Sequence, residues 1–551
     1  MLLGIVFNKG QGGLSRPLAG QDFISGLTFY CANGSLPSGW TTANRTVCLY
    51  QTQDANTNGI LSNYNPNNLL ADSNYADATA AISTVAITTK FVTGDIITIT
   101  CKVPAQLVNT STNQAYIGAK TITLCTYTIL TADSSTTIQG ASIAAAINSN
   151  TYLTGFSATS ATGTISISAP KAYGTSLNGS TTLIGSAPFA VTDSNGSTTG
   201  VFTLTQPAAA TPGTQSLQAI WYYHISEYFR LQPQGQLYVS FYAVNSAYTF
   251  TELTTIQTGT NGIIRQMGVY MGNPSYTHAF TVGDTTAINS EVVANDDGAK
   301  MPMSVLYSAD MVTTYSSSLS TLPNLNNYNN NKVSIILGQD GAAQGAFLFT
   351  TAGYSISCIG AALGATSYAN VQEDIGWLAK FNMTNGSELN TPALSNGQLI
   401  GAPGVSANYL TAIDSNRYIF LLTYVGNSGV FFNDSHCACT LSSDYAYIEN
   451  NRVIDKADRG LYASILPQLK GPLLLNDDGT LSDTTIAYIT GLAYVPLNAM
   501  ISAGNLSDAE VTIPTAQLIQ QTGSLAINVY LLAIGISRNI EVNIGYVLQL
   551  P

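Results

Sequence analysis

The segment from Leu237 to Asp340 constrains the fold most, because continuous apolar runs alternate there with helix-like stretches. The runs are LYVSFYAV, IIRQMGVYM, MSVLYSADM and KVSIILGQD. An almost uninterrupted apolar run is typical of a strand that is buried on both faces of a sheet. A helix-like segment, SLQAIWYYHISEYFRL, precedes the first run. We therefore predict an α/β (α+β) core over residues 213–400, in which helices cover both faces of one sheet.

A different kind of sequence lies between Ala80 and Pro212, where Thr, Ser, Ala and Gly predominate. The segments DIITIT, KTITLCTYTIL and GTISISAP alternate with a period of two residues, as half-buried strands do. We predict a mainly β insertion domain over residues 80–212. Residues 21–79 then form the N-terminal part of the core.

Both ends of the chain predict extended arms. Residues 1–20 join a short apolar run, Leu3–Phe7, to a glycine-rich stretch that contains one proline, a composition typical of a flexible arm. Near the other end, Leu525–Gly535 and Ile540–Gln549 predict two strands on either side of Ser537-Arg538-Asn539.

The chain is poor in charge. Charged residues make up 9% of it, against about 25% in an ordinary globular protein. So little charge suits a protein that packs against copies of itself, and equally an uncharged extracellular β-protein. The net charge of −12 with 18 basic residues argues against nucleic-acid binding, which needs clustered Lys and Arg.

Two apolar stretches have some features of an export signal or a membrane span. The opening MLLGIVFNKG has no basic residue before its apolar run, so we expect no export signal. The uncharged stretch Ala342–Gln372 is long enough to span a bilayer, but it carries several hydroxyl and amide side chains. We predict a buried helix followed by a loop there, and no stable membrane insertion.

No segment predicts catalysis, a metal site or a cofactor. Gly426-Asn427-Ser428-Gly429 resembles the serine segment of chymotrypsin-like proteases, but Val430 follows where that family has glycine, so a turn between strands is expected. His436-Cys437-Ala438-Cys439 lacks the separated fourth ligand that zinc needs. Asn476–Gly479 is half a calcium loop without its closing Glu, and we predict a turn before a helix capped by Ser482. Seven cysteines, an odd number, predict reduced thiols.

The segment around residues 449–465 predicts an amphipathic helix. At 100° per residue, one apolar sector and one charged sector lie opposite each other. The apolar sector contains Val453, Ile454, Ala457, Leu461 and Ile465. The charged sector contains Glu449, Arg452, Lys456 and Arg459. This sector is either an ordinary solvated face or a contact surface.

Three segments of the last third carry a family resemblance. They are RYIFLLTYV (Arg417–Val425), GVFFND (Gly429–Asp434) and SSDYAYIENNRVIDKADR (Ser442–Arg459). Together they resemble the C-terminal domain of contractile tail sheath proteins of phage tails and related injection machines. The N-terminal GQGGLSRPLAGQDFISGL and the closing GISRNIEVNIGYVLQL extend the resemblance to both ends, while the insertion lies outside it.

The resemblance implies a structural subunit and no enzyme. Such a subunit forms a helical array, with hexameric rings, around an inner tail tube and contracts to drive the tube through a target cell envelope. Its partners would be copies of itself, the tube, the baseplate and the tail terminator. It would be made in the host cytoplasm and located in a virion tail or contractile injection particle, with the insertion on its outer surface.

The resemblance also implies site residues. Residues 401–551 would form the C-terminal sheath domain, whose tube-proximal helix presents Glu449, Arg452, Lys456 and Arg459 to the tube or to a neighbouring subunit. The arms would add strands to neighbouring subunits. The residues of these strands are Leu3, Gly4, Ile5, Val6, Phe7, Ile527, Val529, Ile540, Val542 and Ile544.

Two alternatives remain. One is another virion structural protein, such as a tail tube subunit, although 551 residues with an α/β core exceed the usual single domain. The other is a secreted β-rich adhesin, which would need an export signal.

Overall fold

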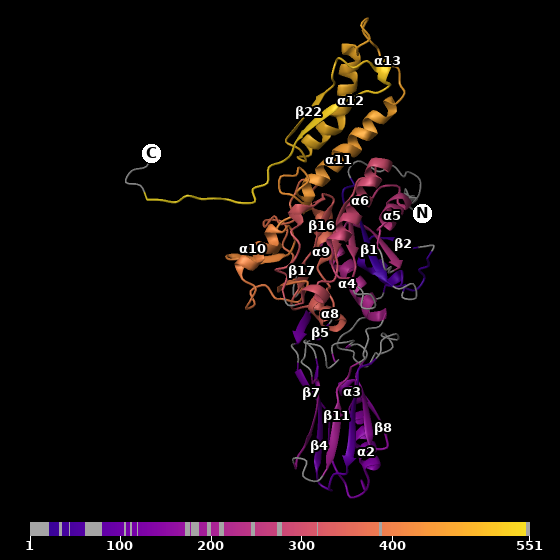
Figure 1. Ribbon diagram of the computed structural model, residues 1–551, viewed down its shortest axis with the longest axis vertical. Helices are drawn as coiled ribbons and strands as arrows, with labels where there is room; N and C mark the ends of the chain where they lie inside the picture. The colour runs from indigo at the N-terminus through magenta and orange to yellow at the C-terminus, as the bar shows by residue number, and fades with distance from the viewer. Residues whose placement is uncertain are drawn as a thin grey trace, which may run out of the picture.

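The molecule is elongated, with three parts along its length (Figure 1). A computed structural model describes residues 21–31, 36–42, 45–60, 80–103, 106–110, 113–117, 120–170, 173, 177, 187–195, 200–208, 214–243, 248–272, 278–316, 318–384 and 388–546. The α/β core lies in the middle. The insertion domain projects from one end of the core, and a helical hairpin with a small β-hairpin projects from the other.

The core is built on one six-stranded sheet in the order β16-β14-β13-β1-β12-β2. Its strands are β1 (Ile24–Cys31), β2 (Thr46–Leu49), β12 (Gln236–Ala243), β13 (Gln266–Tyr270), β14 (Ser304–Ser308) and β16 (Val333–Ile335). All neighbours pair in parallel except β2, which is antiparallel to β12. The predicted sheet from continuous apolar runs is therefore confirmed, and β1, from the N-terminal part, lies at its centre.

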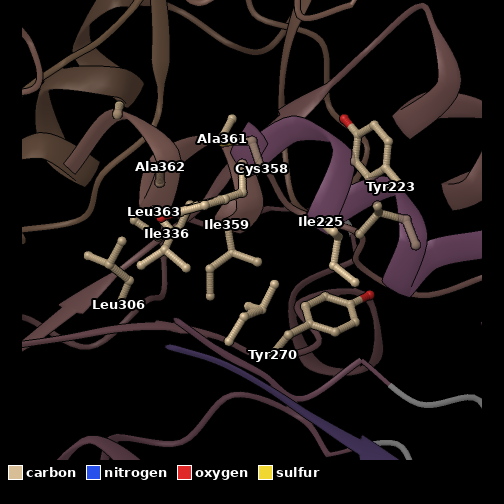
Figure 2. Packing of buried hydrophobic residues seen from close by; sticks show 14 of the residues in the cluster. Tyr223, Ile225, Tyr270, Leu306, Ile336, Cys358, Ile359, Ala361, Ala362 and Leu363 are labelled. Carbon is tan, nitrogen blue, oxygen red and sulfur yellow. The ribbon is translucent and has the colours of Figure 1, made fainter. Parts of the chain in front are cut away.

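Helices cover both faces of this sheet. One face packs against α1 (Thr52–Thr57), α4 (Thr214–Leu231), α8 (Gln344–Ala352) and α9 (Ile359–Tyr368), and the other against α5 (Glu252–Gly259), α6 (Val282–Ala299) and α10 (Ala407–Ser415). Figure 2 shows Ile359 of α9 close to Ile225 of α4 and above Tyr270 of the sheet, while Leu363 lies on the side of Ile336 and Leu306. The prediction of one helix in Ala342–Gln372 was wrong, because this stretch forms two helices. Gly353, at φ +75°, ends α8, and α9 begins at Ile359.

Helices α4 and α9 approach each other closely at two glycines. A Cβ on Gly360 would lie 2.2 Å from the carbonyl oxygen of His224, and one on Gly364 would lie 2.7 Å from that of Tyr228. Backbone atoms cannot rotate away, so a larger residue must push the helices apart. We expect Gly360→Ala to lower the free energy of unfolding by about 1–3 kcal/mol, measured by denaturant titration with tryptophan fluorescence.

Gly298 of α6 supplies the matched control for this prediction. A Cβ there would meet no atom within 4 Å, so Gly298→Ala should be neutral, or stabilising by up to about 1 kcal/mol through helix propensity. Equal effects at the two sites would show that the close approach of α4 and α9 does not limit stability.

The insertion domain is mainly β, as its alternating pattern predicts. Its two sheets have the orders β10-β4-β7 and β11-β3-β9-β8. The strands are β3 (Ile82–Thr89), β4 (Ile96–Val103), β7 (Lys120–Thr128), β8 (Ser157–Ala161), β9 (Thr164–Ser168), β10 (Phe189–Asp193) and β11 (Val201–Thr205), with helices α2 (Thr136–Ser149) and α3 (Thr151–Thr154). A separate hairpin, β5 (Gln106–Thr110) and β6 (Asn113–Ile117), lies towards the core (Figure 1). Cys101 and Cys125 are buried free thiols.

The C-terminal part packs helix on helix beside a β-hairpin. Helices α11 (Ile448–Ile465) and α12 (Asp483–Ser502) lie against each other, and β22 (Asp508–Thr512) pairs with β23 (Asn528–Leu532). A Cβ on Gly460 of α11 would lie 2.7 Å from Pro496 of α12, so this glycine permits the close contact. The predicted cap is confirmed, since the Ser482 hydroxyl accepts from Thr485 N. By length and composition, α12 is the one described helix apolar enough to cross a membrane.

Part of residues 401–439, which the sequence prediction assigns to the C-terminal domain over 401–551, packs against the core. Tyr418 and Phe420 are buried in the core, and Ile419 forms a parallel bridge with Ile336. A turn at residues 425–426 joins β19 (Leu421–Tyr424) to β20 (Asn427–Phe432), so the turn predicted at 426–429 lies earlier and residues 427–429 begin β20. Short pairs also join β17 (Gly338–Asp340) to β18 (Pro392–Leu394) and β15 (Asn329–Asn330) to β21 (Ala438–Cys439).

Candidate subunit interface

The apolar sector of α11 faces α12. Val453 and Ala457 are buried in one cluster with Ala493 and Leu497 of α12, and Leu461 and Ile465 pack at its edge. Ile454 is half-buried. This sector of the amphipathic helix is thus used inside the chain, which confirms the predicted helix and its apolar side.

The basic residues of the charged sector gather around Asp22, which lies two residues before β1. Lys456 Nζ lies 2.6 Å from Asp22 Oδ2, and Arg459 Nη2 lies 3.2 Å from Asp22 Oδ1. Arg452 is buried and donates to the carbonyl oxygens of Ala369 and Asn370 at 3.2 Å and of Asp22 at 3.5 Å. Burial lowers the pKa of Arg452 to about 10. The N-terminal end of the core sheet is therefore tied to α11.

Glu449, the acidic member of that sector, binds Arg538 together with two other carboxylates. Arg538 Nε lies 2.9 Å from Asp434 Oδ1, and Nη2 lies 3.2 Å from Asp374 Oδ2 and pairs with Glu449 Oε1. The guanidinium also lies 3.5 Å from the centroid of the Tyr447 ring, a cation–π contact. Burial, followed by the neighbouring carboxylates, raises the pKa of Asp374 to about 8.

The four residues of the charged sector of α11 all make contacts within the chain. Glu449 and Arg452 are 2% and 4% exposed, and their hydrogen bonds lie within the chain. Lys456 and Arg459 are largely buried against Asp22. Their contact with the tube or with a neighbouring subunit stays a prediction.

Sequence reasoning missed the partners Asp22 and Arg538. One signal was available for Arg538, which is the only charged residue between Glu510 and Glu541. An isolated charged residue in so long an uncharged stretch indicates a specific partner, because the residues around it are otherwise uncharged.

The predicted C-terminal strand residues divide into two groups. Val529 lies in β23 and pairs with Val511 of the same chain, and Ile527 packs against the same unit. That stretch is a strand, as predicted, but it belongs to the body of the molecule. Ile540, Val542 and Ile544 are 77%, 69% and 92% exposed.

The chain after β23 leaves the body as an extended arm (Figure 1). Residues 533–546, named here the C-terminal arm, form no ladder with any other described residue. The predicted N-terminal strand, Leu3, Gly4, Ile5, Val6 and Phe7, lies outside the described residues.

The thiol and imidazole groups at 436–439 are engaged in packing. His436 Nε2 lies 3.0 Å from Asp414 Oδ1, and Cys437 and Cys439 are buried free thiols. Burial raises the pKa of Cys437 to about 12, which disfavours the thiolate that binds metals. Among the described residues, no group of three or more His, Cys, Asp or Glu side chains is arranged to hold a metal ion.

Several solved structures are similar to this chain, and they are sheath proteins. The sheath tail protein of Listeria innocua has 11% identity and a TM-score of 0.35, over 93% of this chain and 94% of that one. The sheath tail protein of Desulfitobacterium hafniense has 11% identity and a TM-score of 0.36, over 96% and 100%. The contracted helical sheath of the anti-feeding prophage has 14% identity and a TM-score of 0.39, over 62% and 84%.

The sequence comparisons give a family. Among curated proteins, none matches the chain. The family model described as DUF2586, N-terminal domain, matches residues 2–436, and that described as DUF2586, C-terminal domain, matches residues 444–551. The interval between the two matches lies just before α11, where the fold also divides. The chain therefore belongs to the DUF2586 family.

Proposed function

We propose that this chain is the structural subunit of a contractile tail sheath. The observation that carries the proposal is the C-terminal arm. Its apolar residues Ile540, Val542 and Ile544 alternate with Glu541 and Asn543, which is the pattern of a strand with one face to bury. An isolated strand is not stable in water, so this arm needs a sheet edge to join.

A second copy of the chain is the proposed owner of that edge. Strand addition supplies main-chain hydrogen bonds for affinity and buries alternate side chains for specificity. Sheath subunits, which Ser442–Ala457 resembles in sequence, use their terminal arms in this way. Charged residues make up only 9% of the chain. A surface with so little charge also suits a subunit that packs permanently against copies of itself.

The proposed array encloses an inner tail tube and ends at the baseplate and the tail terminator. The α11–α12 hairpin would face the tube. The insertion domain lies at the opposite end of the molecule (Figure 1), so in that orientation it would lie on the outer surface. The proposed location is a virion tail or a contractile injection particle.

Contraction in this proposal needs no chemical step. The arms would hold neighbouring subunits together while their bodies rotate from a strained, extended packing to a tighter one. Main-chain hydrogen bonds of an added strand persist during such a rotation, because the strand moves with the sheet it has joined.

Deletion of residues 539–551 is expected to abolish assembly while leaving the monomer folded. The purified chain at high concentration should give hollow cylinders or stacked rings in negative-stain electron microscopy, and the truncated chain should give none. Replacing Ile540, Val542 and Ile544 with Ser should act in the same way, since it removes the face to be buried.

The exposed Val425 provides the control for these changes. It is fully exposed at the β19–β20 turn, so Val425→Ser makes the same kind of change outside the arm and should assemble normally. Normal cylinders from the truncated chain would exclude the arm as the connector. A monomer under all conditions from the full chain would reject a self-assembling sheath.

A further inference from the structure

Two ion-pair clusters connect both ends of the described chain to the same helix, α11. We propose that these clusters are clamps that fix where the terminal arms leave the body, and so position the arms to reach a neighbouring copy of the chain. The Asp22 clamp consists of Asp22 with Arg452, Lys456 and Arg459. The Arg538 clamp consists of Arg538 with Asp374, Asp434 and Glu449. The assembly part of this inference rests on the proposed function, while the clamps themselves do not.

The position of each clamp along the chain supports this role. Asp22 lies directly after residues 1–20 and two residues before β1 begins. Arg538 lies within the C-terminal arm, six residues after β23 ends and two before Ile540. Each clamp therefore holds the chain at the point where a terminal segment meets the folded body.

The two clamps have opposite charge patterns. In the Asp22 clamp, the Asp22 carboxylate pairs with Lys456 and Arg459, and Arg452 donates to the main-chain carbonyl oxygen of Asp22. In the Arg538 clamp, one guanidinium on the arm meets three acidic side chains, of which Glu449 belongs to α11. Along the helix, Glu449 and Arg459 are separated by about 15 Å at 1.5 Å per residue.

Opposite charge patterns prevent the two ends from exchanging places. Asp22 in the acidic cluster, or Arg538 in the basic one, would bring like charges together in a partly desolvated site, which is unfavourable. Charge-assisted hydrogen bonds also fix direction better than apolar contacts do, because their geometry is narrow. The chain has 9% charged residues, and eight of them form these two clusters.

Trypsin cleavage after Arg538 measures the opening of its clamp directly. Arg538 is the last Lys or Arg of the chain, so cleavage there releases the peptide 539–551, which mass spectrometry can follow. The protease must take the Arg538 side chain, so the site is cut only when the clamp is open. Asp434→Asn should speed release at least tenfold, which corresponds to about 1.4 kcal/mol in the opening equilibrium.

Two matched variants distinguish the clamp from a general loosening of the structure. Asp444→Asn makes the same change at an exposed carboxylate close in sequence, and should leave the rate unaltered. Asp374→Asn should have a smaller effect than Asp434→Asn at pH 7, because Asp374, with a pKa raised to about 8, is then mostly protonated. That difference should shrink at pH 9. The other groups facing this site are Glu449, Tyr447 and His436, whose Nδ1 lies 3.8 Å from Asp434.

The Asp22 clamp is tested by a pair of lysine replacements. Lys456→Gln removes one member of the clamp, and Lys470→Gln makes the same change at an exposed lysine beyond α11. With tryptophan fluorescence unchanged in both, Lys456→Gln should raise the concentration needed for cylinders at least fivefold and Lys470→Gln should not.

Two results would overturn the inference. One is release of 539–551 from Asp434→Asn at the wild-type rate, and the other is identical assembly of the two lysine variants. If the wild-type chain forms no cylinders, the proposed function fails, but the trypsin assay still decides whether Arg538 is clamped.

Discussion

Lys332→Met is expected to lower the free energy of unfolding of the core by about 3–5 kcal/mol, the range for breaking a buried ion pair. Lys332 Nζ pairs with Asp455 Oδ1, and their side chains are 8% and 5% exposed. The pair joins the start of β16 to α11, which links the sheet to the C-terminal part. Removal of the ammonium group would leave the Asp455 carboxylate buried without a counter-ion.

Tryptophan fluorescence during denaturant titration reports this change selectively. The three tryptophans, Trp40, Trp221 and Trp377, all lie outside residues 80–212, so unfolding of the insertion domain does not contribute. The midpoint should fall while the denaturant dependence stays constant.

The double variant Lys332→Met with Asp455→Leu is the control. It removes both charges, and replacement of a buried pair by apolar side chains is often neutral or stabilising. We expect the double variant to recover most of the loss. If Lys332→Met alone lowers the free energy of unfolding by less than about 1 kcal/mol, the pair contributes no more than an exposed surface ion pair does.

The core sheet was predictable because a strand that is buried on both faces has a recognisable local sequence pattern. Each strand of the sheet had to be apolar at successive positions, whatever its partners, so the runs around Val239, Val269 and Val305 were visible in the sequence. The position of β1 was not predictable. It pairs with β12 and β13, some 200 residues away along the chain, and no local pattern records a contact across an intervening domain.

The charged side of α11 shows a second limit of sequence patterns. A helical period separates apolar from charged positions, but it does not tell a solvated charged face from one paired inside the protein. The pairing depends on Asp22 and Arg538, which lie at opposite ends of the sequence. The sequence therefore placed Glu449 and Arg452 on one side of the helix but did not reveal that both side chains are buried within the chain.

The alternating pattern of the C-terminal arm was predictable, but the sequence did not show whether the arm pairs with a strand of the same chain. The alternation at Ile540, Val542 and Ile544 indicates a strand, and the structure leaves these side chains exposed. Val529 has a similar alternating context but lies in a hairpin with β22. The difference arises from Asp508–Thr512, which offers β23 a partner within the chain and offers the arm none.

Acidification is expected to destabilise the core through His224, by about 1.4 kcal/mol for each pH unit below 6.5. His224 is fully buried among Phe29, Tyr223 and Tyr270, with its ring centroid 4.4 Å from that of Tyr270. Neither ring nitrogen has a hydrogen-bond partner in the described part of the chain. Burial lowers the pKa of His224 from 6.5 to about 3.

The sign follows from proton binding in the two states. Between pH 6.5 and about 3 the unfolded chain protonates this histidine and the folded chain does not, so stability falls as the pH falls. Protonation of Asp374 changes the stability in the opposite direction. Its folded pKa is raised to about 8 from 3.8, so the folded state binds more protons within that window and stability rises on acidification. The wild-type pH profile therefore mixes both contributions.

Comparison with His224→Leu isolates the histidine. The difference in unfolding free energy between the variant and the wild type should be constant above pH 7. It should shift in favour of the variant by about 3 kcal/mol between pH 6.5 and 4. Asp374 and the remaining histidines are present in both proteins and cancel in this difference. Any packing defect from leucine adds an offset that does not depend on pH, so parallel curves would mean that His224 is protonated in the folded core.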